Sequence, residues 1–254
     1  MSEVVYGGAE GLELDALAVF SHPDDAELTC GGTLLKLKAL GRRTGVVDVT
    51  RGEMGTRGTP EQRFEEAREA ARIMRLDVRV NLDQPDGRVF VTDEARTALV
   101  RVIRTYRPKV IFTAHWDDPH PDHAATARLA REAARLASMR RYDEAAGQGA
   151  VRVPALAHAA YSRLVAPSFV VDVSEFVEEK LRAILAHRSQ FYDPNSREPV
   201  TRISEEGFLK QLESRWRYAG SLINVAAGEA YYVREALNVH DPFELLTRPM
   251  NIYS

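Results

Sequence analysis

Short apolar runs alternate with helical stretches along the first half of the chain, and this alternation constrains the fold more than any other feature. The runs lie at Ala16–Phe20, Thr44–Val49, Val78–Leu82 and Val110–Thr113. The stretches between them carry apolar residues at helical spacing. Because strand–helix–strand units build parallel sheets through right-handed crossovers, the pattern predicts a mainly parallel, Rossmann-like sheet covered by helices.

Several helix starts can be placed from local signals. Thr59 precedes a proline and stands three residues before Gln62, which is the arrangement of an N-cap, an N1 proline and a capping-box glutamine. Thr92 precedes two acidic residues in a similar way. A helix is also expected over Thr33–Leu40, after a Gly-Gly pair, and another after the HPDH segment at residues 120–123.

The last third of the chain continues the pattern less regularly. A polar surface loop is expected first, over Ser138–Pro154. Three strands are expected at Ala157–Ser162, Phe169–Val173 and Ala230–Val233, and two helices at Glu175–His187 and Glu206–Tyr218. Nothing repeats internally. We therefore predict one three-layer α/β/α domain over residues 1–254, with residues 1–14 as an N-terminal extension.

Composition excludes several classes of protein. With Cys30 as its one cysteine the chain forms no intramolecular disulfide, which fits a reducing cytosol. A net charge of -3 gives no electrostatic footprint for nucleic acid. The opening residues lack the pattern of a secretory signal, and no run approaches the roughly 18 apolar residues of a membrane span. We expect a cytoplasmic protein that binds neither nucleic acid nor membrane.

Ionisable side chains gather after two of the expected strands. The segment SHPDDAE follows Ala16–Phe20, and the segment HWDDPHPDH, residues 115–123, follows Val110–Thr113. Ligands of an open α/β sheet bind outside the carboxyl ends of its strands, so the two segments can share one site. Histidines and carboxylates without cysteine suit a hydrolytic zinc site that leaves a position for water.

Other interpretations of these segments stay open from the residues alone. Acids at a helix N-terminus complement the helix dipole, so Asp24, Asp25 and Glu27 can also serve as caps. Spacing lets His22 and Asp25 converge on one ion, but it does not decide which histidine of HPDH joins them. A metal-binding module without catalysis is one alternative. A nucleotide-binding α/β protein is another, although no G-x-G-x-x-G pattern is present.

The motifs HPDDAE, TRGE and HPDH, in this order, resemble the LmbE-like (PIG-L) family of zinc-dependent N-acetylglucosamine deacetylases. Later segments such as GEAYYVREAL resemble the bacillithiol-pathway members, which act on N-acetylglucosaminyl-malate. The resemblance covers roughly Leu17 to Leu237. It implies a deacetylase of N-acetylglucosaminyl-malate, with a mycothiol precursor or a chitooligosaccharide as alternative substrates. It also implies one zinc ion per chain and a homo-oligomer, often a hexamer.

Carried over residue by residue, the resemblance also assigns roles. It makes three residues the zinc ligands: His22, Asp25 and His123. It makes Asp24 the general base that takes a proton from water. It gives stabilisation of the oxyanion to His120, with Asp122 orienting that histidine.

Three further residues are expected to contact the substrate: Arg51, Glu53 and Tyr192. Arg51 follows the second expected strand, and its planar guanidinium suits a carboxylate such as those of malate. The residue before HPDH is Pro119, where bacillithiol-pathway members commonly carry arginine. A contact made by that arginine is therefore absent here or comes from another residue.

Overall fold

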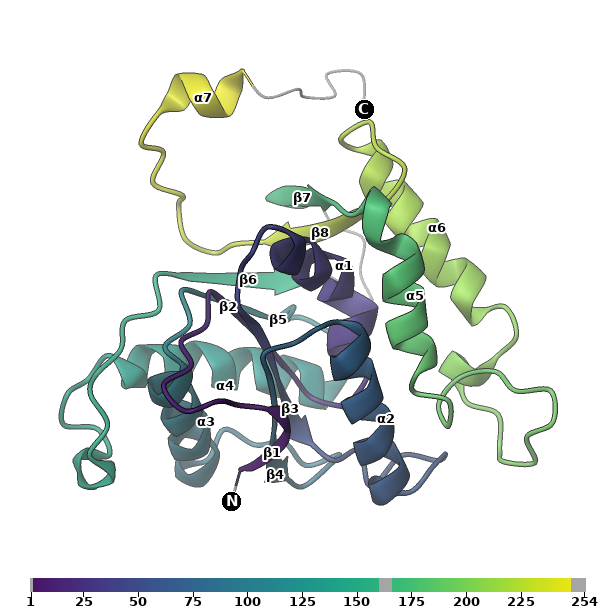
Figure 1. Cartoon of the computed structure of the whole chain (residues 1–254), viewed down its shortest axis with the longest axis horizontal. Coiled ribbons are helices and arrows are strands. Elements are labelled where there is room, and N and C mark those ends of the chain that lie inside the picture. The colour runs from purple at the N-terminus through teal and green to yellow at the C-terminus, as the bar shows by residue number, and fades with distance from the viewer. Residues whose placement is uncertain (1, 160–165, 248–254) are drawn as a thin grey trace.

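An eight-stranded sheet forms the middle layer of the protein in the computed structural model, which describes residues 2–159 and 166–247 (Figure 1). The strand order is β1-β4-β3-β2-β5-β6-β8-β7. The five strands from β4 to β6 in this order run parallel, whereas β1 pairs antiparallel with β4, and β8 with both β6 and β7. The strands are β1 (Glu3–Gly7), β2 (Ala16–Phe20), β3 (Thr44–Thr50), β4 (Val78–Gln84), β5 (Val110–Ala114), β6 (Ala155–Ala159), β7 (Phe169–Asp172) and β8 (Gly228–Tyr232).

Helices cover both faces of the sheet, which confirms the predicted three-layer α/β/α class (Figure 1). Helices α3 and α4 pack on one face, α1, α2 and α5 on the other, and α6 packs against α5. The helices are α1 (Asp25–Ala39), α2 (Pro60–Ile73), α3 (Asp93–Tyr106), α4 (Pro121–Ala137), α5 (Val177–Leu185), α6 (Phe208–Ser221) and α7 (Pro242–Leu246), with 3-10 turns at Glu144–Ala146, Ser174–Phe176 and Arg202–Ser204. Within the described residues, none of these helices combines the length and the apolar character of a membrane span.

The predicted N-cap residues are confirmed, but one helix starts earlier than expected. The side-chain oxygen of Thr59 accepts a hydrogen bond from the backbone of Gln62, and Thr92 caps α3 in the same way. Helix α1 begins at Asp25 rather than Thr33, so the Gly-Gly pair lies inside it. A Cβ atom on Gly32 would lie 2.8 Å from Val173 Cβ, which shows that this glycine allows close packing instead of a turn.

Both ends of the chain add strands to the sheet. Residues 3–7, predicted as part of an extension, form edge strand β1. The strand predicted at Ala157–Ser162 is β6, and residues 160–162 lie outside the described part of the chain. The last third of the chain supplies the antiparallel edge made by β8 and β7. A sequence pattern places such strands but does not give their partners.

The strand order reverses between β2 and β5. The chain runs outward from β2 to β3 and β4, then crosses back to place β5 on the other side of β2. A hydrogen bond of 2.9 Å between Ser21 Oγ and Thr126 Oγ1 joins the end of β2 to α4. Such a reversal opens a crevice at the carboxyl ends of the two strands, where α/β proteins bind ligands. The two ionisable segments follow β2 and β5 and therefore meet there.

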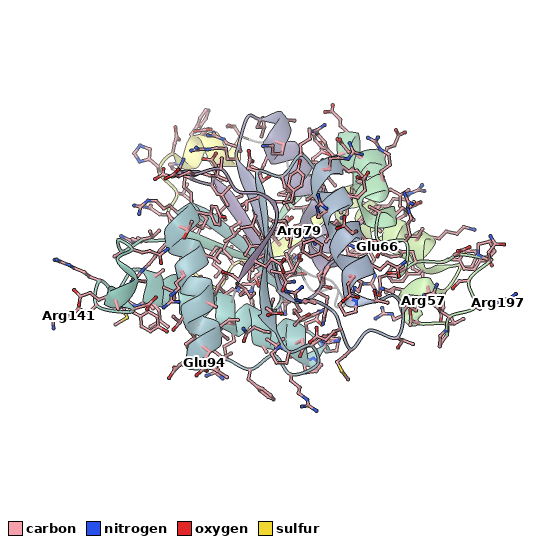
Figure 2. All side chains as sticks on the ribbon, turned by 60° about the horizontal axis from the view of Figure 1, so that its bottom comes forward. Arg57, Glu66, Arg79, Glu94, Arg141 and Arg197 are labelled. Carbon is pink, nitrogen blue, oxygen red and sulfur yellow. The ribbon has the colours of Figure 1, made fainter. Side chains whose placement is uncertain are left out.

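A buried ion-pair network joins α1, β3 and β4. Arg79 of β4 is fully buried and lies near the centre of the molecule (Figure 2). Its guanidinium donates to Asp48 at 2.7 and 2.9 Å. It also donates to Glu27 Oε1 at 2.5 Å. Burial raises the pKa of Glu27, but Arg79 outweighs this effect and lowers the pKa to about 2. Glu27 is thus held as a structural carboxylate, not as a helix cap.

Candidate metal centre

Two histidines and an aspartate converge at the crevice between β2 and β5. His22 and Asp25 come from the β2–α1 turn, and His123 from the first turn of α4. Asp25 Oδ2 lies 3.2 Å from His22 Nδ1, and Asp25 Oδ1 lies 3.3 Å from His123 Nε2. One donor atom from each residue lies within 4.8 Å of the others, as ligands of a single ion require.

The remaining ring nitrogen of each histidine faces a carboxylate. His22 Nε2 lies 3.0 Å from Asp86 Oδ1, and His123 Nδ1 lies 3.1 Å from Asp118 Oδ1. Carboxylates in this position fix the ring orientation of metal-ligating histidines and raise their basicity. The sequence predicts no role for Asp86, and it places Asp118 in the ionisable segment 115–123 without assigning it one. A usable signal was present for Asp86, which follows β4 at the same edge of the sheet.

The charges of this group favour a bound cation. Burial lowers the pKa of His123, but Asp25 and Asp118 outweigh it and raise the pKa to about 10. Burial likewise lowers the pKa of His22, and Asp25 reverses this effect and raises it well above its usual range. Burial raises the pKa of Asp25, but His123 and His22 hold it well below the usual range. The carboxylates therefore stabilise positive charge at the two histidines, and the nitrogen and oxygen donors that zinc prefers are all present.

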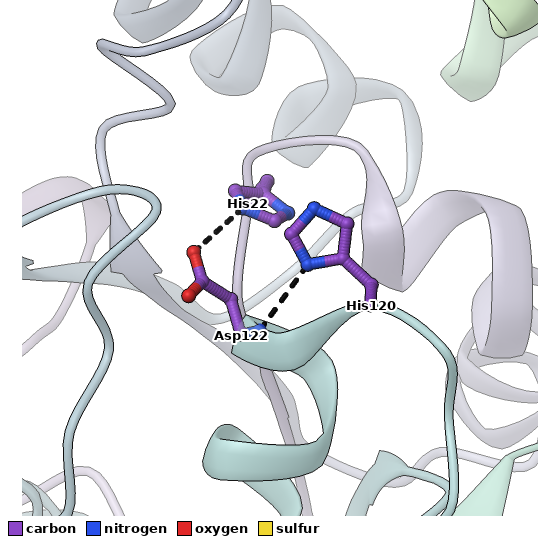
Figure 3. A group of neighbouring side chains, drawn as sticks. All are labelled: His22, His120 and Asp122. Atoms are coloured by element: carbon purple, nitrogen blue, oxygen red, sulfur yellow. Dashed lines mark hydrogen bonds and ion pairs between the residues drawn. The ribbon is translucent and has the colours of Figure 1, made fainter.

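A second trio, His22, His120 and Asp122, shares one histidine with the first (Figure 3). The backbone N–H of Asp122 donates to His120 Nδ1 at 3.2 Å, so the contact that orients His120 comes from the backbone. The Asp122 carboxylate instead accepts from the backbone of Gly87 and Val89 and lies 3.5 Å from His22 Nε2. Both oxygens of Asp122 thus accept backbone hydrogen bonds, whereas the backbone of the described residues donates only to Oδ2 of Asp25 and leaves its Oδ1 for an ion, so the trio with Asp25 and His123 is the better metal site.

His120 is placed to donate a hydrogen bond into the site. Its Nδ1 accepts from the backbone, so the neutral ring carries its proton on Nε2. Burial, followed by the charges of His123 and His22, lowers the pKa of His120, which keeps the ring neutral at neutral pH. A neutral imidazole with a defined N–H is a suitable partner for a developing oxyanion.

Asp24 is the N-cap residue of α1, but it has an unusual backbone conformation and its side chain does not cap the helix. Its φ is 136°, and its side chain makes no cap hydrogen bond to α1. A non-glycine residue in such a conformation costs about 1–3 kcal/mol and is typical of functional sites. Burial raises the pKa of Asp24 to about 6 against the opposing charge of Arg63, whose Nη2 lies 3.5 Å from Asp24 Oδ2. This carboxylate therefore combines strain, burial and a pKa near neutrality.

A cavity of about 360 Å³ contains these groups and has room for a small ligand. It is lined by the metal trio of His22, Asp25 and His123, and by the predicted catalytic residues Asp24 and His120. The remaining lining residues are Leu28 of α1, Arg63 of α2 and residues of three connecting segments: Met54 and Gly55; Asp86 and Gly87; and Gln190, Arg202 and Ile203. Arg202 belongs to a 3-10 turn far along the chain, and sequence reasoning did not identify it. The cavity thus gains a cation from the last third of the chain.

The three predicted substrate contacts lie outside this lining. Arg51 donates to Asp83 and Glu3, each at 2.7 Å. Glu53 Oε1 accepts from the backbone of Asp86 at 2.7 Å, and this bond holds the loop that carries an aspartate of the site. Tyr192 is 46% exposed and lines a neighbouring cavity. Their roles toward substrate stay predictions.

The Gly52→Ala substitution is expected to disturb the support of Asp24. Gly52 has a φ of 69°, and a Cβ there would lie 1.9 Å from Nη1 of Arg63. That guanidinium donates to the carbonyls of Gly52 and Pro23, so its displacement loosens the turn beside Asp24. We expect Gly52→Ala to lower stability in urea unfolding by clearly more than the roughly 1–2 kcal/mol of left-handed strain alone.

Gly41→Ala provides the matched control for this substitution. Gly41 has a φ of 73°, but nothing lies within 4 Å of its added Cβ. This variant should show the backbone strain without the clash, and it should retain full activity. Equal losses of stability and activity in the two variants would show that Arg63 does not support the turn that carries Asp24.

Residues 17–134 match the family described as PIG-L, GlcNAc-PI de-N-acetylase. The diacetylchitobiose deacetylase of Thermococcus kodakarensis is 32% identical over 191 residues, which are 69% of each chain. The chain belongs to the PIG-L family of deacetylases. Proteins of the PIG-L family are metal-dependent amidohydrolases, and the zinc on which they depend fits the donors of His22, Asp25 and His123.

Two further relatives of this PIG-L family member extend the match. A solved structure of a conserved protein from Thermus thermophilus is 40% identical, with a TM-score of 0.79 over 89% of this chain and 97% of that one. A probable N-acetyl-alpha-D-glucosaminyl L-malate deacetylase of Bacillus cereus is 28% identical over 70% of this chain and 84% of its own. The predicted enzyme class is confirmed, while the bacillithiol assignment rests on a relative that is less similar than the diacetylchitobiose deacetylase.

Proposed function

We propose that the protein removes the acetyl group from an N-acetylglucosaminide, and that its substrate is a short chitooligosaccharide. One observation carries the reaction type. Asp24 and His120 line the same cavity as the metal trio of His22, Asp25 and His123. A site for metal storage needs neither a strained, buried carboxylate nor an oriented N–H donor, whereas amide hydrolysis needs both a base and an oxyanion partner.

The first chemical role belongs to Asp24. When bound by the trio, zinc supplies Lewis-acid polarisation of the acetamide and acidifies water. Asp24 then takes the proton of the attacking water, and a pKa near neutrality suits a group that must accept a proton and later release it. Arg63 holds the turn by donating to the carbonyl of Pro23 at 3.0 Å. The base is thereby kept at the cavity wall.

The second role belongs to His120. Its Nε2–H is available to the cavity because Nδ1 accepts from the backbone of Asp122. A donor fixed in advance stabilises the charge that develops on the acetamide oxygen in the transition state. The Asp122 carboxylate supports this arrangement at a distance, since it holds the loop of Gly87 and Val89 against the site.

The choice of substrate rests on the comparisons and on the cavity. The relative that acts on diacetylchitobiose is 32% identical, and the one named for N-acetylglucosaminyl-malate is 28% identical. These values favour the chitooligosaccharide, an alternative in the sequence analysis, over its first choice of N-acetylglucosaminyl-malate. One observation supports an acidic aglycone as the second candidate: Arg202 places a guanidinium in the lining of the cavity.

Acetate release from the two substrates tests this choice with Arg202→Met and Arg51→Met as a matched pair. We expect wild-type protein to have the higher kcat/KM on diacetylchitobiose. Loss of the Arg202 charge should lower kcat/KM on N-acetylglucosaminyl-malate by about tenfold or more, the effect of one hydrogen bond to a charged group. Diacetylchitobiose carries no carboxylate, so its kcat/KM should fall by less than about threefold.

Arg51→Met gives the opposite test, because Arg51 is already paired with Asp83 and Glu3. This substitution should not lower kcat/KM selectively for either substrate. A selective loss on the malate substrate in this variant would restore the original prediction for Arg51, and a higher kcat/KM for malate in wild-type protein would overturn the chitooligosaccharide proposal. The homo-oligomer, the cytoplasmic location and the count of one zinc per chain stay predictions.

A further inference from the structure

A second cavity, of about 780 Å³, lies on the α3 and α4 side of the sheet and shares no lining residue with the metal site. Its wall combines residues from the loop after β5, from α3 and α4, from β6 and from the segment after β8. Those that matter for its chemistry are Trp116, Arg128, Arg131, Arg135, His158 and Arg234. Its size is that of a pocket for a small organic molecule.

His158 lines this cavity, and one of its ring nitrogens is buried without a partner in the described part of the chain. The side chain lies on β6, is 1% exposed, and its Nδ1 lies 2.8 Å from the carbonyl oxygen of Ala114, to which it donates. The proton on Nδ1 leaves Nε2 as an acceptor, and this atom has no hydrogen-bond partner among the described residues. Burial lowers the pKa of His158 to about 4, so the ring is neutral. A buried unpaired acceptor is unfavourable and is usually matched by a ligand or water.

The same wall carries an excess of positive charge. The lining contains five arginines but two carboxylates, those of Asp93 and Glu132. Arg96 and Arg128 pair with these acids at 2.7–2.8 Å, and Arg131 pairs with Glu235. Within the described residues, Arg135 and Arg234 have no carboxylate partner, and the Arg234 guanidinium lies 4.2 Å from the centre of the Trp116 ring. Two guanidinium groups are thus available to an anion.

We propose that this cavity binds a small hydroxylated anion, with its phosphate or carboxylate on Arg135 and Arg234 and a hydroxyl donating to His158 Nε2. Arginine binds both anions through paired N–H donors. The neutral imidazole accepts from a hydroxyl but offers nothing to an anion, so an inorganic ion satisfies only part of the site. The cavity is therefore a binding site separate from catalysis.

Isothermal titration of the zinc-loaded, full-length protein tests the proposal with four probes: glucose 6-phosphate, gluconate, glucose and inorganic phosphate. One or both of the hydroxylated anions should bind at least about tenfold more tightly than glucose or phosphate, since each simple probe lacks one of the two contacts. The tighter of the two anions identifies phosphate or carboxylate as the preferred group. Absence of binding by both hydroxylated anions would overturn the proposal.

The double variant Arg135→Met with Arg234→Met locates the bound probe. It should weaken binding of the preferred anion by at least about tenfold, while its acetate release stays at the wild-type rate. Arg217→Met, an exposed arginine on α6 away from the cavity, is the matched control and should bind like wild type. Unchanged affinity in the double variant would place the anion elsewhere and contradict the proposal. So would a ¹⁵N resonance of His158 Nε2 that does not move when the anion binds.

Discussion

Replacing His123 with alanine is expected to remove zinc from the protein, whereas His120→Ala should leave it largely bound. His123 Nε2 faces Asp25, and its other nitrogen is held by Asp118. The Nδ1 atom of His120 instead accepts a hydrogen bond from the backbone N–H of Asp122 at the N-terminus of α4. Loss of even an outer carboxylate partner typically reduces metal affinity or activity by about 10–100-fold, and loss of a direct ligand should exceed this.

Zinc per chain, measured by elemental analysis, separates the two histidines. His123→Ala should lose both zinc and acetate release. His120→Ala should keep zinc and lose most of its activity, since the oxyanion donor is gone. Asp118→Asn is the graded control, because it weakens the support of His123 without removing a ligand. Equal loss of zinc in the two alanine variants would show that the assignment within HPDH is wrong.

Asp24→Asn should keep zinc and lose turnover. The amide has nearly the shape of the carboxylate but cannot accept a proton, and general acid–base catalysis contributes about 10²–10⁴-fold. The measurement is kcat for acetate release at matched zinc content. Asp117→Asn, a change at an exposed acid that is not part of the cavity lining, should retain wild-type kcat.

A loss below tenfold in Asp24→Asn would mean that another group takes the proton. Glu27 is a poor substitute, because Arg79 holds its carboxylate in a buried ion pair. Asp86 is also a poor substitute, because it contacts His22 Nε2. If Asp86 moved to take the proton, His22 would lose this contact. The substitution therefore tests Asp24 directly.

The sheet and the meeting of the two ionisable segments could be predicted from the sequence. The apolar runs that became β2, β3, β4 and β5 differ from the observed strands by no more than a few residues, because burial on both faces leaves a clear local signal. The convergence of His22 with His123 follows from topology, since β2 and β5 are neighbours in a parallel sheet. Local pattern and chain order suffice for both results.

The partners of the site could not be predicted in the same way. Asp86 and Arg202 reach the cavity, and Asp118 reaches His123, through loop conformations that no periodic pattern encodes. The position of Arg51 depends on edge strand β1, which brings Glu3 to its guanidinium across the sheet. A residue placed at the right edge of a sheet by sequence reasoning can still turn away from the cavity.

The most direct test of the account is acetate release from diacetylchitobiose by protein of known zinc content, before and after chelation. We expect acetate and free amine to appear in equal amounts, the reaction to stop when zinc is removed, and activity to return when zinc is restored. A panel of N-acetylglucosaminides with neutral and acidic aglycones completes the measurement. Protein that binds zinc through His22, Asp25 and His123 but releases no acetate from any of them would contradict the deacetylase assignment.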